Sequence, residues 1–379
     1  MAALPGPAVS RALRLWGLVA VGSRMPVAMA PLALVFLGRS TPGGYVLGAA
    51  AAAVYVVGEI AGSAVLGARL GRSRRQLPAG MVVAALAFAV LPFVHGPLLL
   101  AVVFVAGAAP AAAPGGTRAI LTSLVPEEKA ARALSAEAVL SQVIWAGAPA
   151  LVVFLALQVH PGVPLLVATV LFVAGAVVLR WLPAPEPVTA PISRSLWRAW
   201  PIYLTSTAAN ALFAAIELML PAMLEQRRIP VGWAGPLLAW FALACAGGAL
   251  LYGLRTWPGS LRAQCLVLLV CMSCSIALTV FLPGVAGIAA GLLVAGLFQS
   301  GAMVSRSLTL RERLPSYAHA PAYSLMYAAA GVGYSTSAGV SAVAVEVFNA
   351  SVAVLLGVAI TLVIVVVSAV GERPVVKAT

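Results

Sequence analysis

Long apolar runs alternate with short polar breaks along the whole chain of 379 residues. Each run is close to the roughly 20 apolar residues that a helix needs to cross the ~30 Å hydrocarbon core of a bilayer. The breaks contain charged residues, Gly or Pro, which end such runs. The runs are 13–37, 45–66, 77–94, 98–121, 133–158, 164–181, 201–224, 233–254, 264–282, 285–305, 321–345 and 350–370. The pattern predicts an all-α integral membrane protein with about 12 transmembrane helices.

Several of these spans contain proline, and in two of them the prolines bear on where a helix breaks. The least regular is 98–121, which contains Pro110 and Pro114, although neighbouring helices can cover the carbonyls that a proline frees. In the first span, Pro26 and Pro31 follow Arg24. They predict a broken helix whose carbonyls face a cavity.

The composition excludes a water-soluble globule. Hydrophobic residues make up 62% of the chain, charged residues 9%, and the mean hydropathy is +1.05. Soluble domains are nearer half apolar and a quarter charged. Four cysteines in so apolar a chain also exclude a disulfide scaffold.

Basic residues are unevenly divided between the two sides of the predicted helices. With a cytoplasmic N-terminus, eighteen Lys and Arg fall in inner segments and three in outer loops. The positive-inside rule then places both termini in the cytoplasm. The net charge of +13 is scattered between apolar runs rather than gathered in one basic domain, which argues against a nucleic-acid partner.

The longest polar break divides the chain into two nearly equal halves. It runs from Leu182 to Arg198 and contains four prolines. It predicts an N-terminal six-helix bundle at 1–181, a cytoplasmic linker at 182–198 and a C-terminal six-helix bundle at 199–379. Two six-helix pseudo-repeats are the organisation of many secondary transporters.

The loop after the second span carries a short motif on the predicted cytoplasmic side. It resembles the loop G-x-L-A-D-R-x-G-R-R of the major facilitator superfamily, with Ala68 in place of the Asp and Ala64 in place of the leading Gly. The matching residues are Leu66, Arg69, Gly71 and Arg72. The resemblance implies that these residues form a gating loop.

Two further elements resemble this superfamily. Gly147 and Pro149 in the fifth span are similar to the Gly-Pro element of its antiporters, and Arg118 is similar to its fourth-span arginine. The resemblance implies an alternating-access transporter. It also implies that substrate binds between the halves, with spans 1, 4, 7 and 10 lining the path.

Charged side chains within the first two spans are candidates for the substrate or proton path, because a charge in lipid is costly. Arg24 lies near the midplane of the first span. It either binds an anion, acts in gating, pairs with Glu59 or packs at the interface between spans. Glu59 is either a proton site or the fixed partner of Arg24. Gly58 and Gly62 beside it predict a close helix approach.

A polar stripe marks the seventh span. Tyr203, Thr207, Asn210 and Glu217 lie on one helix face, which makes them candidates for substrate or proton binding. A hydrogen-bonded helix–helix seam is the alternative. Gln299 is a further inward-facing candidate in the tenth span.

The remaining polar groups have structural interpretations. Arg118 and Glu137 lie near the cytoplasmic ends of consecutive spans, which predicts a structural or gating ion pair. The stripe formed by Tyr323, Tyr327 and Tyr334 predicts helix packing. The cysteines are interpreted as packing residues, without a metal or redox site.

The function that these features favour is secondary active transport of a small molecule across the cytoplasmic (inner) membrane of a bacterium. The antiporter-like element favours efflux, and membrane-embedded Glu residues favour proton coupling. No catalytic set or nucleotide-binding loop is present in the sequence, so we expect neither an enzyme nor a cofactor. We expect a monomer in the lipid bilayer. The alternative is a sensor, assembly factor or lipid-handling protein of the same fold that does not transport.

Overall fold

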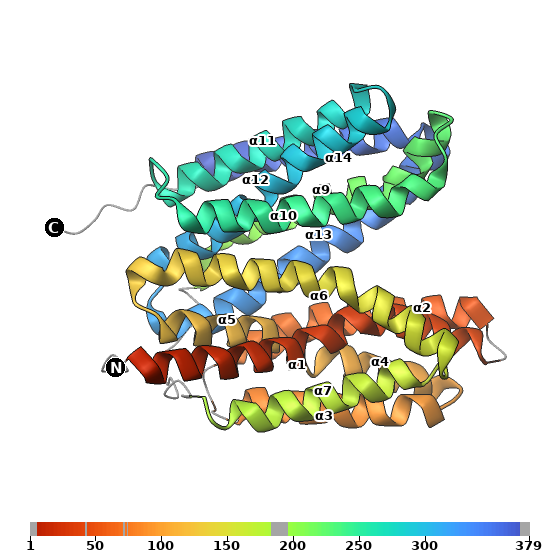
Figure 1. Ribbon diagram of the computed structural model, residues 1–379, viewed down its shortest axis with the longest axis vertical. Helices are drawn as coiled ribbons and strands as arrows, with labels where there is room; N and C mark the ends of the chain where they lie inside the picture. Colours follow the sequence, from red (N-terminus) through yellow and green to blue (C-terminus); the bar gives the residue numbers. More distant parts are fainter. Residues whose placement is uncertain (1–5, 42–43, 71–72, 74, 183–195, 372–379) are drawn as a thin grey trace. The chain divides into compact units, whose positions relative to one another are not determined.

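The computed structural model describes residues 6–41, 44–70, 73, 75–182 and 196–371, and this part of the chain is helical without strands (Figure 1). Every predicted span coincides with one helix, except 98–121, which coincides with two. The helices are α1 (Gly6–Arg39), α2 (Gly44–Val65), α3 (Gln76–Val90), α4 (Pro97–Ala108), α5 (Ala113–Leu124), α6 (Ala130–Gln158), α7 (Val163–Leu179), α9 (Trp200–Gln226), α10 (Ala234–Leu254), α11 (Leu261–Phe281), α12 (Gly284–Arg313), α13 (His319–Val347) and α14 (Ala350–Gly371).

Length and composition fit a protein that crosses the membrane many times. In the described residues, 10 helical segments are long and apolar enough to span a bilayer, and Val163–Leu179 is a shorter apolar helix. Large apolar side chains such as Leu86 and Val170 lie on the outside, 62% and 66% exposed, as lipid-facing residues do. The total of about 12 spans and the side on which the termini lie stay predictions.

The prolines of the fourth and the first predicted spans act differently. In the fourth predicted span, α4 ends at Ala108 and α5 begins at Ala113, because Pro110 between them has no N–H to continue the helix. In the first span, α1 continues through Pro26 and Pro31 over 34 residues. The predicted break after Arg24 is therefore wrong, since packing against α2, α5 and α7 supports the helix despite the lost hydrogen bonds.

The chain forms two compact units. The first consists of Met1–Lys129, Val143–Ile192 and Ser316–Ala328, and the second of Ala130–Gln142, Ser193–Pro315 and Ala329–Thr379. Helices α6 and α13 are thus divided between the units. The division into 1–181, 182–198 and 199–379 stays a prediction, and most of its linker lies outside the described residues.

Close helix packing in the first unit depends on glycine. Helices α1 and α3 pack on α7, and α2 packs on α4 (Figure 1). A Cβ atom on Gly62 of α2 would lie 2.2 Å from the Ala108 carbonyl oxygen, and one on Gly58 would lie 2.4 Å from that of Phe104. The predicted close approach at Gly58 and Gly62 is confirmed.

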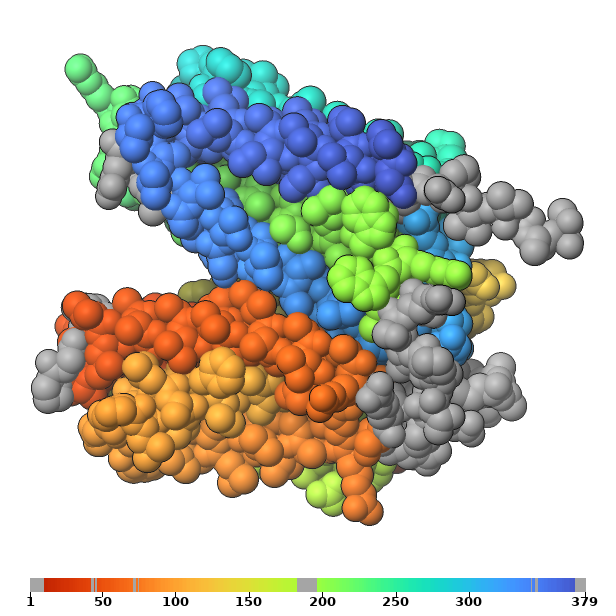
Figure 2. Space-filling view, turned by 180° about the vertical axis from the view of Figure 1, so that it is seen from behind, coloured from red at the N-terminus to blue at the C-terminus, as the bar shows by residue number. Residues whose placement is uncertain are grey.

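The second unit is built around an apolar core from α9, α10, α11, α12 and α14, to which α13 adds Ala344. Helix α14 lies next to α9 on the face of this unit that Figure 2 shows. The fully buried residues of this core include Leu212, Leu220, Leu269 and Leu292. Because these helices are tied together inside one core, the polar groups between them are held in fixed positions.

Candidate functional site

The first polar cluster joins α1 to α5 in the first unit. Arg24 is only 8% exposed, and its Nη2 atom lies 3.4 Å from the Thr117 hydroxyl oxygen. The Trp16 indole also donates to the Thr117 main-chain carbonyl at 2.8 Å. The first and fourth predicted spans therefore meet at a buried cation, which in a membrane protein marks a functional candidate.

Arg118, the next residue of α5, lies against two tyrosines of α13. Its side chain is 1% exposed, and the guanidinium carbon lies 5.0 Å from the ring centroid of Tyr327 and 5.7 Å from that of Tyr323. Both distances are within the range of cation–π attraction. Two residues of the tyrosine stripe, Tyr323 and Tyr327, thus contact a cation in addition to packing between helices.

The predicted pair of Arg118 and Glu137 stays a prediction. Glu137 is fully buried on the part of α6 that belongs to the second unit, whereas Arg118 belongs to the first. The main-chain carbonyl of Glu137 accepts a hydrogen bond from the Ser141 hydroxyl at 2.9 Å.

Glu59 lies partly buried on α2, where this helix packs on α4. Its roles as a proton site and as the partner of Arg24 both stay predictions.

The second polar cluster joins α9 to α13 within the second unit. The Tyr334 hydroxyl donates a 3.0 Å hydrogen bond to the Glu217 carboxylate, and the Tyr334 ring packs against Phe213. Nearly three turns before Glu217 on α9, the Thr207 hydroxyl donates to the Ala329 carbonyl of α13 at 3.0 Å. Thr207 and Glu217 of the stripe on α9 thus face α13, as expected of a hydrogen-bonded contact between two helices. The Glu217 carboxylate lies at this contact.

The other residues of this stripe are arranged differently. The Asn210 amide donates to the Ser206 carbonyl of its own helix at 3.0 Å. The Tyr203 hydroxyl and the Gln299 Oε1 atom are buried, and neither has a hydrogen-bond partner among the described residues. A buried polar atom without a partner costs about 1–3 kcal/mol, so such atoms indicate places where a water or a ligand binds.

The motif loop after α2 is only partly within the described residues, because Gly71 and Arg72 lie outside them. Arg69 is exposed and ends a short 3-10 helix, Gly67–Arg69. The Gln76 amide donates to the Leu66 carbonyl at 2.6 Å, which ties the start of α3 to the start of this loop.

The antiporter-like element lies within α6, which continues through Pro149. A Cβ atom on Gly147 would meet open space, so helix packing does not explain this glycine. A gating role for Gly147 and Pro149 stays a prediction.

Arg306 is a buried charge that the apolar pattern does not predict. The apolar run ends at residue 305, which would put Arg306 in a loop, but α12 continues to Arg313. Arg306 is 4% exposed, and its Nη1 atom donates to the Thr205 carbonyl of α9 at 2.7 Å. The neighbouring residues give no specific signal, because a hydroxyl residue also precedes the exposed Arg11.

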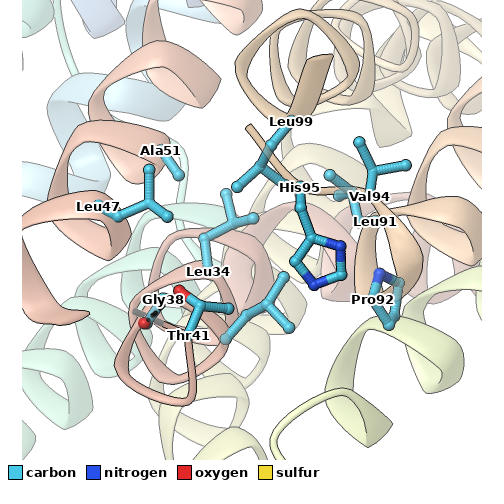
Figure 3. Close-up of a pocket in the computed structure, with 11 residues that line it drawn as sticks. Leu34, Gly38, Thr41, Leu47, Ala51, Leu91, Pro92, Val94, His95 and Leu99 are labelled. Atoms are coloured by element: carbon cyan, nitrogen blue, oxygen red, sulfur yellow. Dashed lines mark hydrogen bonds between the residues drawn. The ribbon is translucent and has the colours of Figure 1, made fainter. Parts of the chain in front are cut away.

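A hollow in the first unit contains none of these polar residues. Leu34, Leu47, Leu91 and Leu99 surround it, with His95 at its side (Figure 3). Elsewhere in the described residues, no group of three or more His, Cys, Asp or Glu side chains is arranged to hold a metal ion. The four cysteines are free.

The arrangement of buried charges on paired helices agrees with the comparison to protein families. The profile described as Major Facilitator Superfamily matches residues 17–289. The chain belongs to the Major Facilitator Superfamily. A comparison with curated protein sequences finds no match.

Solved structures of this superfamily share the fold over nearly the whole chain. A bacterial homologue of the iron transporter ferroportin is 17% identical with a TM-score of 0.75, covering 96% of this chain and 99% of its own. The human organic anion transporter MFSD10 (TETRAN) is 15% identical with a TM-score of 0.77, covering 96% and 100%. The E. coli fucose:proton symporter FucP is 14% identical with a TM-score of 0.72, covering 97% and 99%.

These comparisons establish a multi-pass membrane protein with a transporter fold. The superfamily and its solved structures are transporters rather than enzymes. At such low identity the structures carry the fold alone, and the substrate has to be argued from the residues of this chain.

Proposed function

We propose that the chain is a secondary active transporter that moves a small molecule out of the cell across the cytoplasmic membrane by alternating access, driven by protons. The observation that carries the proposal is Glu217 on α9. Its carboxylate accepts a hydrogen bond from Tyr334 and has no cationic partner among the described residues. An ionisable residue of this kind within a membrane helix is expected to serve the transport path.

Protonation of Glu217 would act on the link between α9 and α13. The ionised carboxylate makes a charge-assisted hydrogen bond with the Tyr334 hydroxyl, which is stronger than a bond to a neutral acid. A proton on Glu217 therefore weakens the link between two helices of the second unit. A change in helix packing that depends on a proton is what coupling to alternating access requires.

The first unit supplies the group that favours an anionic substrate. The Arg24 guanidinium is buried beside Thr117, and guanidinium forks suit carboxylate and phosphate groups. Among the similar structures, MFSD10 is described as an organic anion transporter. We therefore propose a small acidic molecule as the substrate class, with Arg24 as its first contact. Tyr203, Asn210 and Gln299 are the proposed polar contacts in the second unit.

The test is a comparison of metabolites inside and outside cells that produce the chain and cells that lack it. The decisive variant is Glu217→Gln, which keeps the shape and a hydrogen-bond acceptor but cannot carry a proton. Its matched control is Glu225→Gln, the same change at an exposed position of the same helix. We expect a compound that is depleted inside and enriched outside with the natural chain and with Glu225→Gln.

With Glu217→Gln we expect this gradient to fall at least ten-fold, as it should with an uncoupler of the proton gradient. Enrichment inside the cell would reverse the direction while keeping the class of function. An unchanged gradient in Glu217→Gln, with equal amounts of protein in the membrane, would overturn the role of Glu217 in coupling.

A further inference from the structure

A hollow in the second unit brings two arginines together outside the proposed transport residues. Arg262 at the start of α11 and Arg306 near the end of α12 line it, together with Thr205, Thr309 and Ser368 from α9, α12 and α14. No Asp or Glu occurs among the described residues that line this hollow. Two positive charges thus border one small space.

Main-chain carbonyls fix both guanidinium groups. Arg306 donates to the Thr205 carbonyl at 2.7 Å, and Arg262 donates to the Ala369 carbonyl of α14. Arg306 is 4% exposed, whereas Arg262 is only partly buried. Arg306 therefore forms the inner wall of the hollow and Arg262 lies nearer its opening.

The chemistry of the wall selects an anion with several oxygens. The hydroxyls of Thr205 and Thr309 donate to carbonyls of their own helices, at 2.9 Å and 2.8 Å, so the guanidinium groups supply the recognition. Each guanidinium has five N–H donors in a planar fork that matches phosphate oxygens. The hollow has room for a group about the size of a water molecule. One phosphate oxygen would thus enter the hollow beside Arg306, and the other oxygens would stay outside it and contact Arg262.

We propose that Arg262 and Arg306 form a binding site for the phosphate group of an anionic ligand. The site lies at the end of the second unit that the positive-inside rule assigns to the cytoplasm. Trp200, 39% exposed, packs its ring close to Gly371 at the same end of α14. Exposed tryptophans favour the level of lipid headgroups, so a phospholipid and free phosphate both offer the chemistry that this site recognises.

The experiment uses the purified full chain in a neutral detergent. The midpoint of thermal unfolding is followed during titration with inorganic phosphate and, separately, with phosphatidylglycerol, with phosphatidylcholine as the reference lipid. A ligand that binds only the folded chain raises this midpoint. A response to phosphatidylglycerol alone identifies a lipid headgroup as the source, and a response to inorganic phosphate as well identifies a soluble anion.

The variant is Arg262→Gln, and its matched control is Arg255→Gln, an exposed arginine expected on the same side that does not line the hollow. We expect the affinity for the bound anion to fall about ten-fold in Arg262→Gln and to stay unchanged in Arg255→Gln. Arg262→Lys, which keeps the charge and loses the fork, should give an intermediate affinity and serves where the glutamine variant does not accumulate. Equal responses in the Arg262 and Arg255 variants, or no response of the natural chain to either ligand, would overturn the proposal. Transport is not measured here, so this result is independent of the proposed efflux.

Discussion

At the scale of single residues, Arg227 shows how one side chain stabilises a helix end. The last carbonyls of a helix have no partner within the helix. The Arg227 guanidinium donates to the carbonyls of Leu282 at 2.8 Å and Thr279 at 3.1 Å, and also to that of Val280. It thereby satisfies the carbonyl end of α11 and ties this end to the loop after α9.

Replacing Arg227 by Gln removes the charge and most of these donors. We expect the folded state to lose about 2–3 kcal/mol, since hydrogen bonds to a charged group are each worth about 1.5–3 kcal/mol. Thermal unfolding of the purified chain measures this as a lower midpoint. Arg228→Gln is the control, because Arg228 is the neighbouring exposed arginine. Equal midpoints for the two variants would show that the carbonyl contacts contribute nothing.

The residue scale is also where sequence reasoning is weakest. Arg24, Glu59 and Glu217 could be singled out because a charge in an apolar run is conspicuous. Their partners could not be predicted, since Tyr334 lies 117 positions from Glu217 and Thr117 lies 93 positions from Arg24. Only the folded packing of the helices brings such residues together.

At the scale of helices, the sequence predicted most boundaries within a few residues, because about 20 apolar residues are the physical length of a span. The exceptions have tertiary causes. Helix α1 continues past Pro26 and Pro31 because neighbouring helices pack around it. Helix α12 continues past residue 305 because the charge of Arg306 is buried against the Thr205 carbonyl instead of facing water.

The contact between α2 and α4 gives a prediction at this scale. Replacing Gly62 by Val would force side-chain atoms onto the Ala108 carbonyl, since even a Cβ atom there lies only 2.2 Å away. Overpacking of this kind costs about 1–3 kcal/mol, so we expect a lower unfolding midpoint and less protein in the membrane. Ala53→Val, on the exposed side of the same helix, is the control and should leave both unchanged. Equal unfolding midpoints for the two variants would mean that α2 and α4 can move apart to admit the valine without loss of stability.

At the scale of the whole molecule, composition and charge already excluded a soluble protein, and membership of the Major Facilitator Superfamily agrees with that exclusion. Exposed tryptophans lie at several of the predicted helix ends. Trp181, Trp197 and Trp257 are 63%, 77% and 42% exposed at ends that the positive-inside rule assigns to the cytoplasm. Trp233 is 47% exposed at an end assigned to the outside. Tryptophan is enriched at both membrane–water interfaces, where it forms aromatic belts.

This orientation makes a prediction about accessibility. Seven predicted spans separate Ser40 from Ser260, and an odd number of crossings places them on opposite sides. Both serines are exposed, and a single cysteine can be placed at either once the four natural cysteines are replaced. In intact cells, a membrane-impermeant thiol reagent should label Ser40→Cys and leave Ser260→Cys unlabelled until the membrane is opened. The reverse pattern would place both termini outside. Labelling of both positions from one side would show an even number of crossings between them, and the count of about 12 spans would then be wrong in that part of the chain.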